Sequence, residues 1–403
     1  MRTRIACVVL LAVLQPMGAR AQVSMTEQEA VARLSGGAYV MAAEAPIEVA
    51  RAEALAAARW PNPRASFTRE AAGGIAEQFL TASQVLPLTG RRALDMSAAS
   101  ARVEAATRRS DERIARLHAD IRLAFTDLWE AQVRERELQQ SRDRLQSLAT
   151  VLEQREAAGE AAGFDHLRAA REVMEVDVDR ASAAAERIRA EAILNGYFAN
   201  PVDRIEAVPV PPSRTAVPEM DALVTSALAQ RPGFMAMQRE LDAQAFAEQA
   251  ALRRRIPEPE VVGGVKGSDA GTGHLGAILG VHVTVPLFDR AKPELAAEVA
   301  RTGVVRADVL LFRQQLHTEI AVWRAAVIER REIADRYRAS VGASVEQIER
   351  IAQVSYDAGE RGILELLDSY RMTASARVRQ ATLDAAVRAA EIELEFVSGW
   401  ESR

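Results

Sequence analysis

The chain has 403 residues, of which 49% are apolar and 27% are charged. Its 51 basic and 56 acidic residues give a formal net charge of −5. This balance disfavours binding to nucleic acid, since no positive excess is present to neutralise phosphates. The length allows two or three ordinary domains, and the apolar content suffices for a core.

The N-terminus is typical of a secretory signal. Two arginines precede the apolar stretch Ile5–Leu14, and Ala19–Ala21 is a cleavage site of the A-x-A type. A membrane anchor is the alternative, but the stretch has about half of the ~20 residues that a spanning helix needs. We therefore expect residues 1–21 to be a signal peptide and the mature chain to begin at Gln22.

The mature chain is predicted to contain no thiol, because the single cysteine, Cys7, lies inside the signal. Disulfides, thiolate metal sites and cysteine catalysis are then excluded. A lipid anchor would need a cysteine where Gln22 stands, so none is expected. No later stretch approaches 18 uninterrupted apolar residues, so any membrane-spanning part of the mature chain should be β-structure.

Two very long helices are predicted, from about Arg91 to Ala157 and from about Ala291 to Tyr356. The single proline in either segment, Pro293, lies in the first turn, where it is tolerated. At 1.5 Å per residue, roughly 65 residues form a rod of about 100 Å. A compact domain cannot hold such a rod, since its helices average about 12 residues.

The two rods belong to an internal repeat that three landmarks define. Pro61–Pro63 recurs as Pro257–Pro259 with a shift of 196, and Val85–Leu88 recurs as Thr284–Leu287 with a shift of 199. The turn Ala158-Gly159-Glu160 recurs 200 residues later. We expect a first repeat at 22–200 with a strand pair at about 64–87, a proline-rich linker at 201–217, and a second repeat at 218–403 with a strand pair at about 259–286.

Within each repeat a shorter helix should precede the strands, at Pro46–Trp60 and at Pro232–Ile256. Pro87 and Pro286 are predicted to mark the strand-to-helix transitions, because proline cannot donate to a strand ladder and is accepted at a helix start.

The strand predicted from Leu275 to Val285 alternates apolar residues at odd positions with mostly small or polar residues at even ones. Its length matches the ~9–11 residues of a tilted membrane-spanning strand. The alternative is a small soluble sheet packed on the helices. Four strands cannot close a barrel, which needs about eight, so a membrane sheet requires several chains. The sequence thus predicts an obligate oligomer that forms a conduit.

Five segments, in this order, are similar to the TolC-type outer-membrane efflux proteins: Pro61–Pro63, Gln84–Arg92, Arg231–Gly233, Val283–Arg290 and Tyr356–Asp368. The resemblance implies a mainly α fold, in which duplicated antiparallel helices form a trimeric tunnel. Four strands per chain would build a shared 12-stranded barrel. It also implies the outer membrane of a Gram-negative bacterium as the location, with contact to its lipid and a large periplasmic extension. The expected partners are a periplasmic adaptor and an inner-membrane pump of the RND type.

Within that family the segments Leu88–Arg92 and Val285–Arg290 resemble the CzcC-type members that serve heavy-metal pumps. Those members usually continue Arg-Asn-Gln-Gly, where this chain has Arg290-Ala291-Lys292-Pro293. The resemblance implies a passive export duct, with heavy-metal cations as a candidate cargo. A type I secretion duct remains an alternative, as does a soluble periplasmic coiled-coil adaptor.

The resemblance also implies a periplasmic gate near the second turn. Glu365 and Asp368 resemble the two inward acidic residues of the family, which would form a cation-attracting ring where three chains meet. Tyr356 and Arg361 stand where the family places residues that hold the tip shut, and the repeat makes Asp165 the counterpart in the first half. The alternative is that Glu365 and Asp368 are ordinary solvated residues of an amphipathic helix.

The turn glycines Gly159, Gly163, Gly359 and Gly362 mark the two expected tips, which are candidate adaptor contacts or simply turn residues. The five histidines are scattered without metal-ligand spacing. No catalytic or nucleotide-binding motif is present. We therefore expect no enzyme activity, no cofactor and no metal centre.

Overall fold

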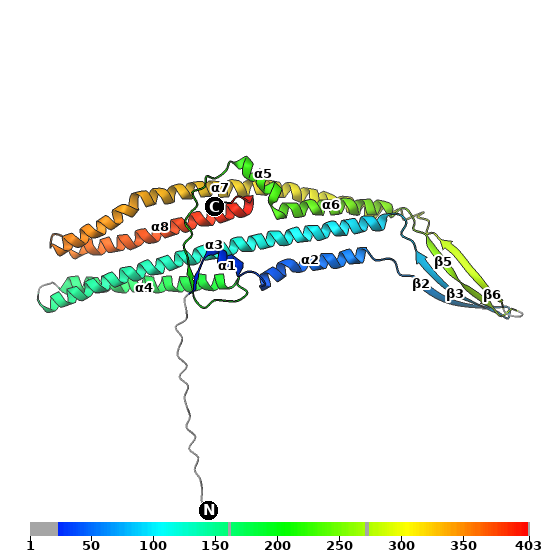
Figure 1. Cartoon of the computed structure of the whole chain (residues 1–403), viewed down its shortest axis with the longest axis horizontal. Coiled ribbons are helices and arrows are strands. Elements are labelled where there is room, and N and C mark those ends of the chain that lie inside the picture. The colour runs from blue at the N-terminus through cyan, green and yellow to red at the C-terminus, as the bar shows by residue number, and fades with distance from the viewer. Residues whose placement is uncertain (1–22, 160–162, 271–273, 402–403) are drawn as a thin grey trace, which may run out of the picture.

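The computed structural model describes residues 23–159, 163–270 and 274–401. The expected signal peptide and its cleavage point lie outside the described residues, as does Glu160 of the first turn. Figure 1 shows an elongated bundle of helices with a small sheet at one end and two helical turns at the other. The expected mainly α fold with a small antiparallel sheet is confirmed.

Two helices run through most of the bundle, α3 (Arg91–Ala157) and α7 (Lys292–Asp357). Gly90 before α3 and Gly159 after it both have a φ of 75°, a left-handed conformation that glycine adopts without a Cβ clash. Gly359 ends α7 in the same way, with a φ of 74°. The two rods predicted from the lack of internal proline are therefore present, each bounded by a local stop signal.

Shorter helices complete a layer that is four helices wide. Near the sheet the contacts run in the order α2 (Ala38–Ala57), α3, α6 (Pro232–Arg253) and α7. Toward the turns the order is α4 (Gly163–Asn195), α3, α8 (Ile363–Ser398) and α7. Helix α4 therefore takes the place of α2 beside α3, and α8 takes the place of α6 between α3 and α7. One edge of the layer is α7, and the other edge is formed by α2 and α4 in turn, here called the α2/α4 edge.

The core follows α3 and changes partners along its length. Around the middle, Ile121, Phe125 and Leu128 of α3 pack against Leu194 of α4 and Ile205 of the short strand β4 (Ile205–Ala207). Toward the turns, leucines of α3 pack against both α4 and α8. A third cluster joins α5 (Met220–Gln230) to α7 and α8. The short helix α1 (Glu27–Ala32) also packs on α3.

The sheet joins the two halves of the chain. Its order is β2 (Arg64–Ala72), β3 (Ile75–Val85), β5 (Glu260–Ser268) and β6 (His274–His282), with every neighbouring pair antiparallel. The two hairpins meet through β3 and β5, so β2 and β6 are the edges. Among the described helices, none combines the length and apolarity required to span a membrane.

Several boundaries differ from those predicted. Helix α2 begins at Ala38, so Pro46 lies inside it. Buried Ala43 and Ala50 lie on either side of that proline, and packing on α3 outweighs its local penalty of about 3 kcal/mol. Strand β6 ends at His282 and not at Val285, because its partner β5 begins at Glu260, opposite His282.

The proline-rich linker contains a strand that its composition did not indicate. Within it, β4 pairs in parallel with β1 (Val23–Met25). Pairing with a segment so distant in sequence leaves no local signal. The domain division at 201–217 stays a prediction. Pro87 and Pro286 both lie in connections that lead from a strand to a long helix.

Candidate functional site: a two-faced sheet, a charged groove and the helical turns

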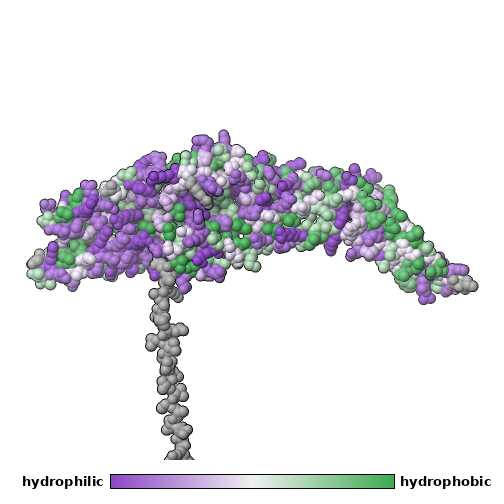
Figure 2. All heavy atoms as spheres, in the orientation of Figure 1, coloured by the Kyte–Doolittle hydropathy of each residue, from purple (hydrophilic) through white to green (hydrophobic). Residues whose placement is uncertain are grey.

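One face of the sheet is apolar and exposed. The strand register places Phe67, Leu80, Val265 and Ala277 in one row across all four strands. The same face carries Leu279, which is 87% exposed. Neighbouring rows of this face add Val261, Leu275 and Val281. In Figure 2, hydrophobic residues (green) gather over the sheet at the right of the view.

Polar residues bound this apolar face along the strands. Gln84 lies on it toward the helices, while Gln78 and Arg69, which are paired, lie on it toward the hairpin tips. The six-residue interval from Gln78 to Gln84 corresponds to about 20 Å of strand. That is close to the ~25 Å apolar band of membrane β-barrels.

The opposite face of the sheet is largely polar. The hydroxyls of Ser66 and Thr81 are 2.8 Å apart, and Ser83 Oγ donates to Glu260 Oε1 at 2.5 Å. Lys266 Nζ lies 2.8 Å from Glu77 Oε1. Side chains on this face therefore bond to one another, whereas the large side chains of the apolar face stay exposed in the part of the chain that the structure describes.

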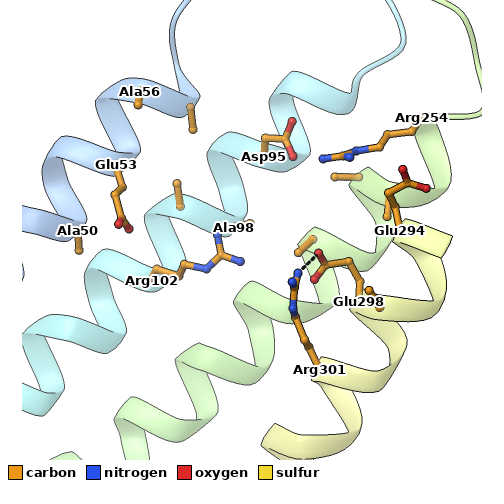
Figure 3. Close-up of a pocket in the computed structure, with 16 residues that line it drawn as sticks. Ala50, Glu53, Ala56, Asp95, Ala98, Arg102, Arg254, Glu294, Glu298 and Arg301 are labelled. Carbon is orange, nitrogen blue, oxygen red and sulfur yellow. Dashed lines mark hydrogen bonds and ion pairs between the residues drawn. The ribbon is translucent and has the colours of Figure 1, made fainter. Parts of the chain in front are cut away.

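A charged groove lies between the sheet and the middle of the bundle (Figure 3). Its volume is about 710 Å³, and its lining comes from all four helices α2, α3, α6 and α7. The main contacts among these helices run in sequence across the layer, from α2 to α3, from α3 to α6 and from α6 to α7. Side chains of both outer helices can reach one groove only if the layer curves around it, so the groove marks the concave side.

The groove mixes both signs of charge among alanines. Its charged lining residues are Glu53, Asp95, Arg102, Arg254, Glu294, Glu298 and Arg301. Figure 3 shows Arg254, which follows α6 directly, extending toward Asp95 of α3. Burial raises the pKa of Asp95, although nearby arginines, Arg254 among them, act in the opposite direction. The wall of the groove is therefore charged and polar between its alanines.

At the other end of the bundle, the turn glycines occupy different conformations. Gly159 and Gly359 have left-handed backbones, whereas Gly362 is the N-cap of α8 with ordinary extended angles. Gly163 begins α4, and a Cβ there would meet the carboxylate of Glu156, which is the end of a flexible side chain that can move aside. Backbone geometry thus explains two of these four glycines, Gly159 and Gly359.

The five predicted gate residues do not converge within one chain. Glu365 and Asp368 are both exposed on α8, while the neighbouring Leu366 and Leu367 are buried. In the part of the chain that is described, neither carboxylate forms an ion pair. Arg361 is exposed just before α8, and Tyr356 packs half-buried against the core of the turn region. Asp165 lies half-buried in the first turn of α4, on the other hairpin.

The structure shows contacts near the turns that the sequence reading missed. His166 Nδ1 lies 2.8 Å from Glu156 Oε2 and ties α4 to α3. Arg371 Nε donates to Glu172 Oε1 at 3.0 Å and ties α8 to α4. The shift of 200 at the turns makes Met372, and not Arg371, the counterpart of Glu172, so the repeat does not identify this pair.

Comparisons with known proteins agree with this architecture. The chain is 25% identical over 294 residues to the cobalt-zinc-cadmium resistance protein CzcC of Cupriavidus metallidurans, covering 70% of this chain and 68% of that protein. No protein-family model matches the chain.

Solved structures show the same fold. The CmeC outer-membrane channel of Campylobacter jejuni has a TM-score of 0.76 at 15% identity, over 93% of this chain and 85% of its own. The outer-membrane protein VceC of Vibrio cholerae has a TM-score of 0.73 at 16% identity, over 94% and 97%. The resemblance to TolC-type outer-membrane proteins is thereby confirmed.

Proposed function

We propose that this chain, which has the fold of the TolC-type outer-membrane channels, is the outer-membrane duct of a tripartite efflux system. It would act as a homotrimer and catalyse nothing. An inner-membrane pump, of the RND type in the resemblance, would supply the energy through a periplasmic adaptor. The sheet would lie in outer-membrane lipid, and the helical bundle would extend into the periplasm.

The observation that carries the proposal is the two-faced sheet with open edges. Its apolar face is suited to lipid, and its polar face to a water-filled passage. Four strands cannot close around a passage, so both edges would remain unpaired in a single chain. In lipid, each unpaired backbone group costs several kcal/mol. Closure by three chains, giving 12 strands, removes these edges.

The helical layer supports side-by-side assembly of chains. Exposed large apolar residues are concentrated on its two edges and are sparse on α3, α6 and α8. On the α7 edge these residues include Val304, Leu310, Val322, Ile351 and Val354, and on the α2/α4 edge Met41, Val49, Leu55, Leu167 and Val178. Such stripes are typical of helix faces that pack against a partner.

The cargo is proposed from the curated relative. CzcC is a cobalt-zinc-cadmium resistance protein, and we infer divalent metal cations as the class to test first. A type I secretion duct has the same architecture and remains the second candidate. A soluble coiled-coil adaptor is disfavoured, because the apolar face of the sheet would then be exposed to water.

The proposal is tested by fractionating cells that express the full chain and measuring the mass of the detergent-extracted particle. We expect a trimer in the outer-membrane fraction. A deletion strain should then become more sensitive to cobalt, zinc or cadmium. Release of a monomer in the periplasmic wash, without detergent, would refute the duct and favour the adaptor.

We propose in addition that Glu365 and Asp368 form the periplasmic gate, together with Tyr356, Arg361 and Asp165, and that the four turn glycines lie at the adaptor contact. The support is that both carboxylates are exposed and unpaired among the described residues, one turn apart on α8. Three such pairs around an aperture would attract and bind divalent cations.

Replacing both Glu365 and Asp368 by alanine should therefore raise single-channel conductance and weaken block by divalent cations, each by severalfold. The measurement is planar-bilayer recording of the purified oligomer. Glu332→Ala and Glu346→Ala on α7 form a matched control, because they remove the same number of carboxylates away from the turn. An unchanged conductance, or an equal effect of the control, would contradict the gate.

A further inference from the structure

We propose that β6 of one protomer pairs with β2 of the next in one defined antiparallel register, in which Val281 lies opposite Phe67 of the partner subunit and His282 opposite Ser66 of the partner subunit. The inference rests on the proposed function, because it requires chains that assemble through their sheet edges. It goes beyond that function by specifying which residues meet.

The first step is that the two hairpins are equivalent residue by residue. The repeat shifts β2 onto β5 by 196 residues and β3 onto β6 by 199. These shifts were defined by proline landmarks at the base of the sheet, of which Val85 alone lies in one of the paired strands. They carry the observed pair Ser66 and Thr81 onto Val262 and Gly280, which are indeed paired. The strands therefore contain no slip that would break the correspondence.

The junction between the two repeats inside the chain shows how one hairpin pairs with the next. Here β3 pairs with β5, and Ser83 lies opposite Val262. If a closed ring of two-repeat chains repeats one geometry at every junction, the junction between chains matches the junction within a chain. The shifts then carry Ser83 onto His282, and Val262 back onto Ser66 of the partner subunit.

The two faces of the sheet support the inferred register independently of the repeat. A register slip of one residue would exchange the apolar and polar faces. The inferred register keeps Val281, on the apolar face of β6, opposite Phe67, on the apolar face of β2. An aliphatic β-branched residue opposite an aromatic one is a favourable cross-strand pair. Only even slips keep the faces, and the repeat selects one of them.

The state of the edges in the single chain agrees with this pairing. All nine residues of β2 are exposed. Strand β6 ends at His282, where its pairing with β5 ends. In the inferred register, Thr284 would reach Arg64 of the partner subunit. Val283 and Val285, which continue the alternation of β6 and are exposed, would then extend the apolar face in the assembly.

Disulfide cross-linking tests the register against a clean background, because Cys7 is the single cysteine of the sequence. We would pair Phe67→Cys with Val281→Cys, and separately Ser66→Cys with His282→Cys. Two adjacent pairs are needed because hydrogen-bonded and non-hydrogen-bonded positions alternate and differ in spacing. Matched controls that keep the face but slip by two residues combine Phe67→Cys with Leu279→Cys or with Val283→Cys.

On oxidation, at least one in-register pair should give covalent dimers and trimers at about ten times the yield of either slipped pair, since cysteines beyond 7 Å are not bridged. The register would be wrong if a slipped pair were linked preferentially, or if no pair were linked in an oligomer of trimer mass. Neither result would contradict the proposed function as a duct. A monomeric particle of the same variants would refute the proposed function itself.

Discussion

Lysine in place of Leu279 should nearly abolish assembly of the protein in the outer membrane, whereas lysine in place of the neighbouring Gly280 should leave assembly close to the wild-type level. Leu279 is 87% exposed on the apolar face of β6. A lysine facing the middle of the bilayer costs roughly 2–4 kcal/mol. That cost recurs in every chain of an oligomer, so the expected effect is large.

Gly280 is a strict control because it is adjacent on the same strand and faces the other side of the sheet. Among the described residues, no atom lies within 4 Å of a Cβ built there, so a side chain can begin at this position without a clash. Assembly is measured by quantitative immunoblotting of the outer-membrane fraction, with unheated gels to display the oligomer. Equal losses in the two variants would indicate a soluble sheet.

The second large effect should come from Glu391 in the middle of the bundle. Its side chain is 0% exposed, and its Oε1 accepts from Arg331 Nη2 at 2.7 Å and from the Ser213 N–H at 3.1 Å. Arg388 Nη1 donates to its Oε2 at 3.3 Å. This carboxylate therefore joins α8, α7 and the linker in one buried ionic cluster.

Changing Glu391 to glutamine keeps the shape but removes the charge and directs an amide N–H toward an arginine. Breaking a buried ion pair in this way costs about 3–5 kcal/mol, and for a chain of this length we expect the thermal midpoint of the detergent-extracted protein to fall by roughly five degrees. Circular dichroism of the helices measures the midpoint.

Glu332→Gln is the matched control, because Glu332 pairs with Arg336 one turn away and both side chains are more than half exposed. An exposed pair of this kind contributes under about 1 kcal/mol. A shift of similar size in both variants would show that the Glu391 cluster does not hold the bundle together.

Signals that act over a few residues allowed much of the fold to be predicted. The proline-free segments and the bounding glycines identified α3 and α7 almost to the residue. The alternation from Leu275 onward identified β6 and its apolar face. The duplicated landmarks indicated two equivalent halves. In each of these cases the chain's own covalent geometry or periodicity determines the outcome, so neighbours in sequence are enough.

The candidate site was harder to predict from the sequence than the fold. Glu365 and Glu391 lie on the same helix and look alike in the sequence, yet one is exposed and the other is fully buried between two arginines. Local periodicity does not distinguish them, because the arginines that neutralise Glu391 include one on a different helix. The same holds for the charged groove, to which four separate helices contribute.

By itself, then, the sequence determined the long helices, the alternating strand and the duplication, all of which depend on local backbone preferences. Only the tertiary structure decided the strand order β2-β3-β5-β6, the passage of α2 through Pro46, and the pairing of β1 with β4. These features depend on contacts between segments far apart in the chain. The free energy of such contacts outweighs local backbone preference, and no pattern in the neighbouring residues indicates them.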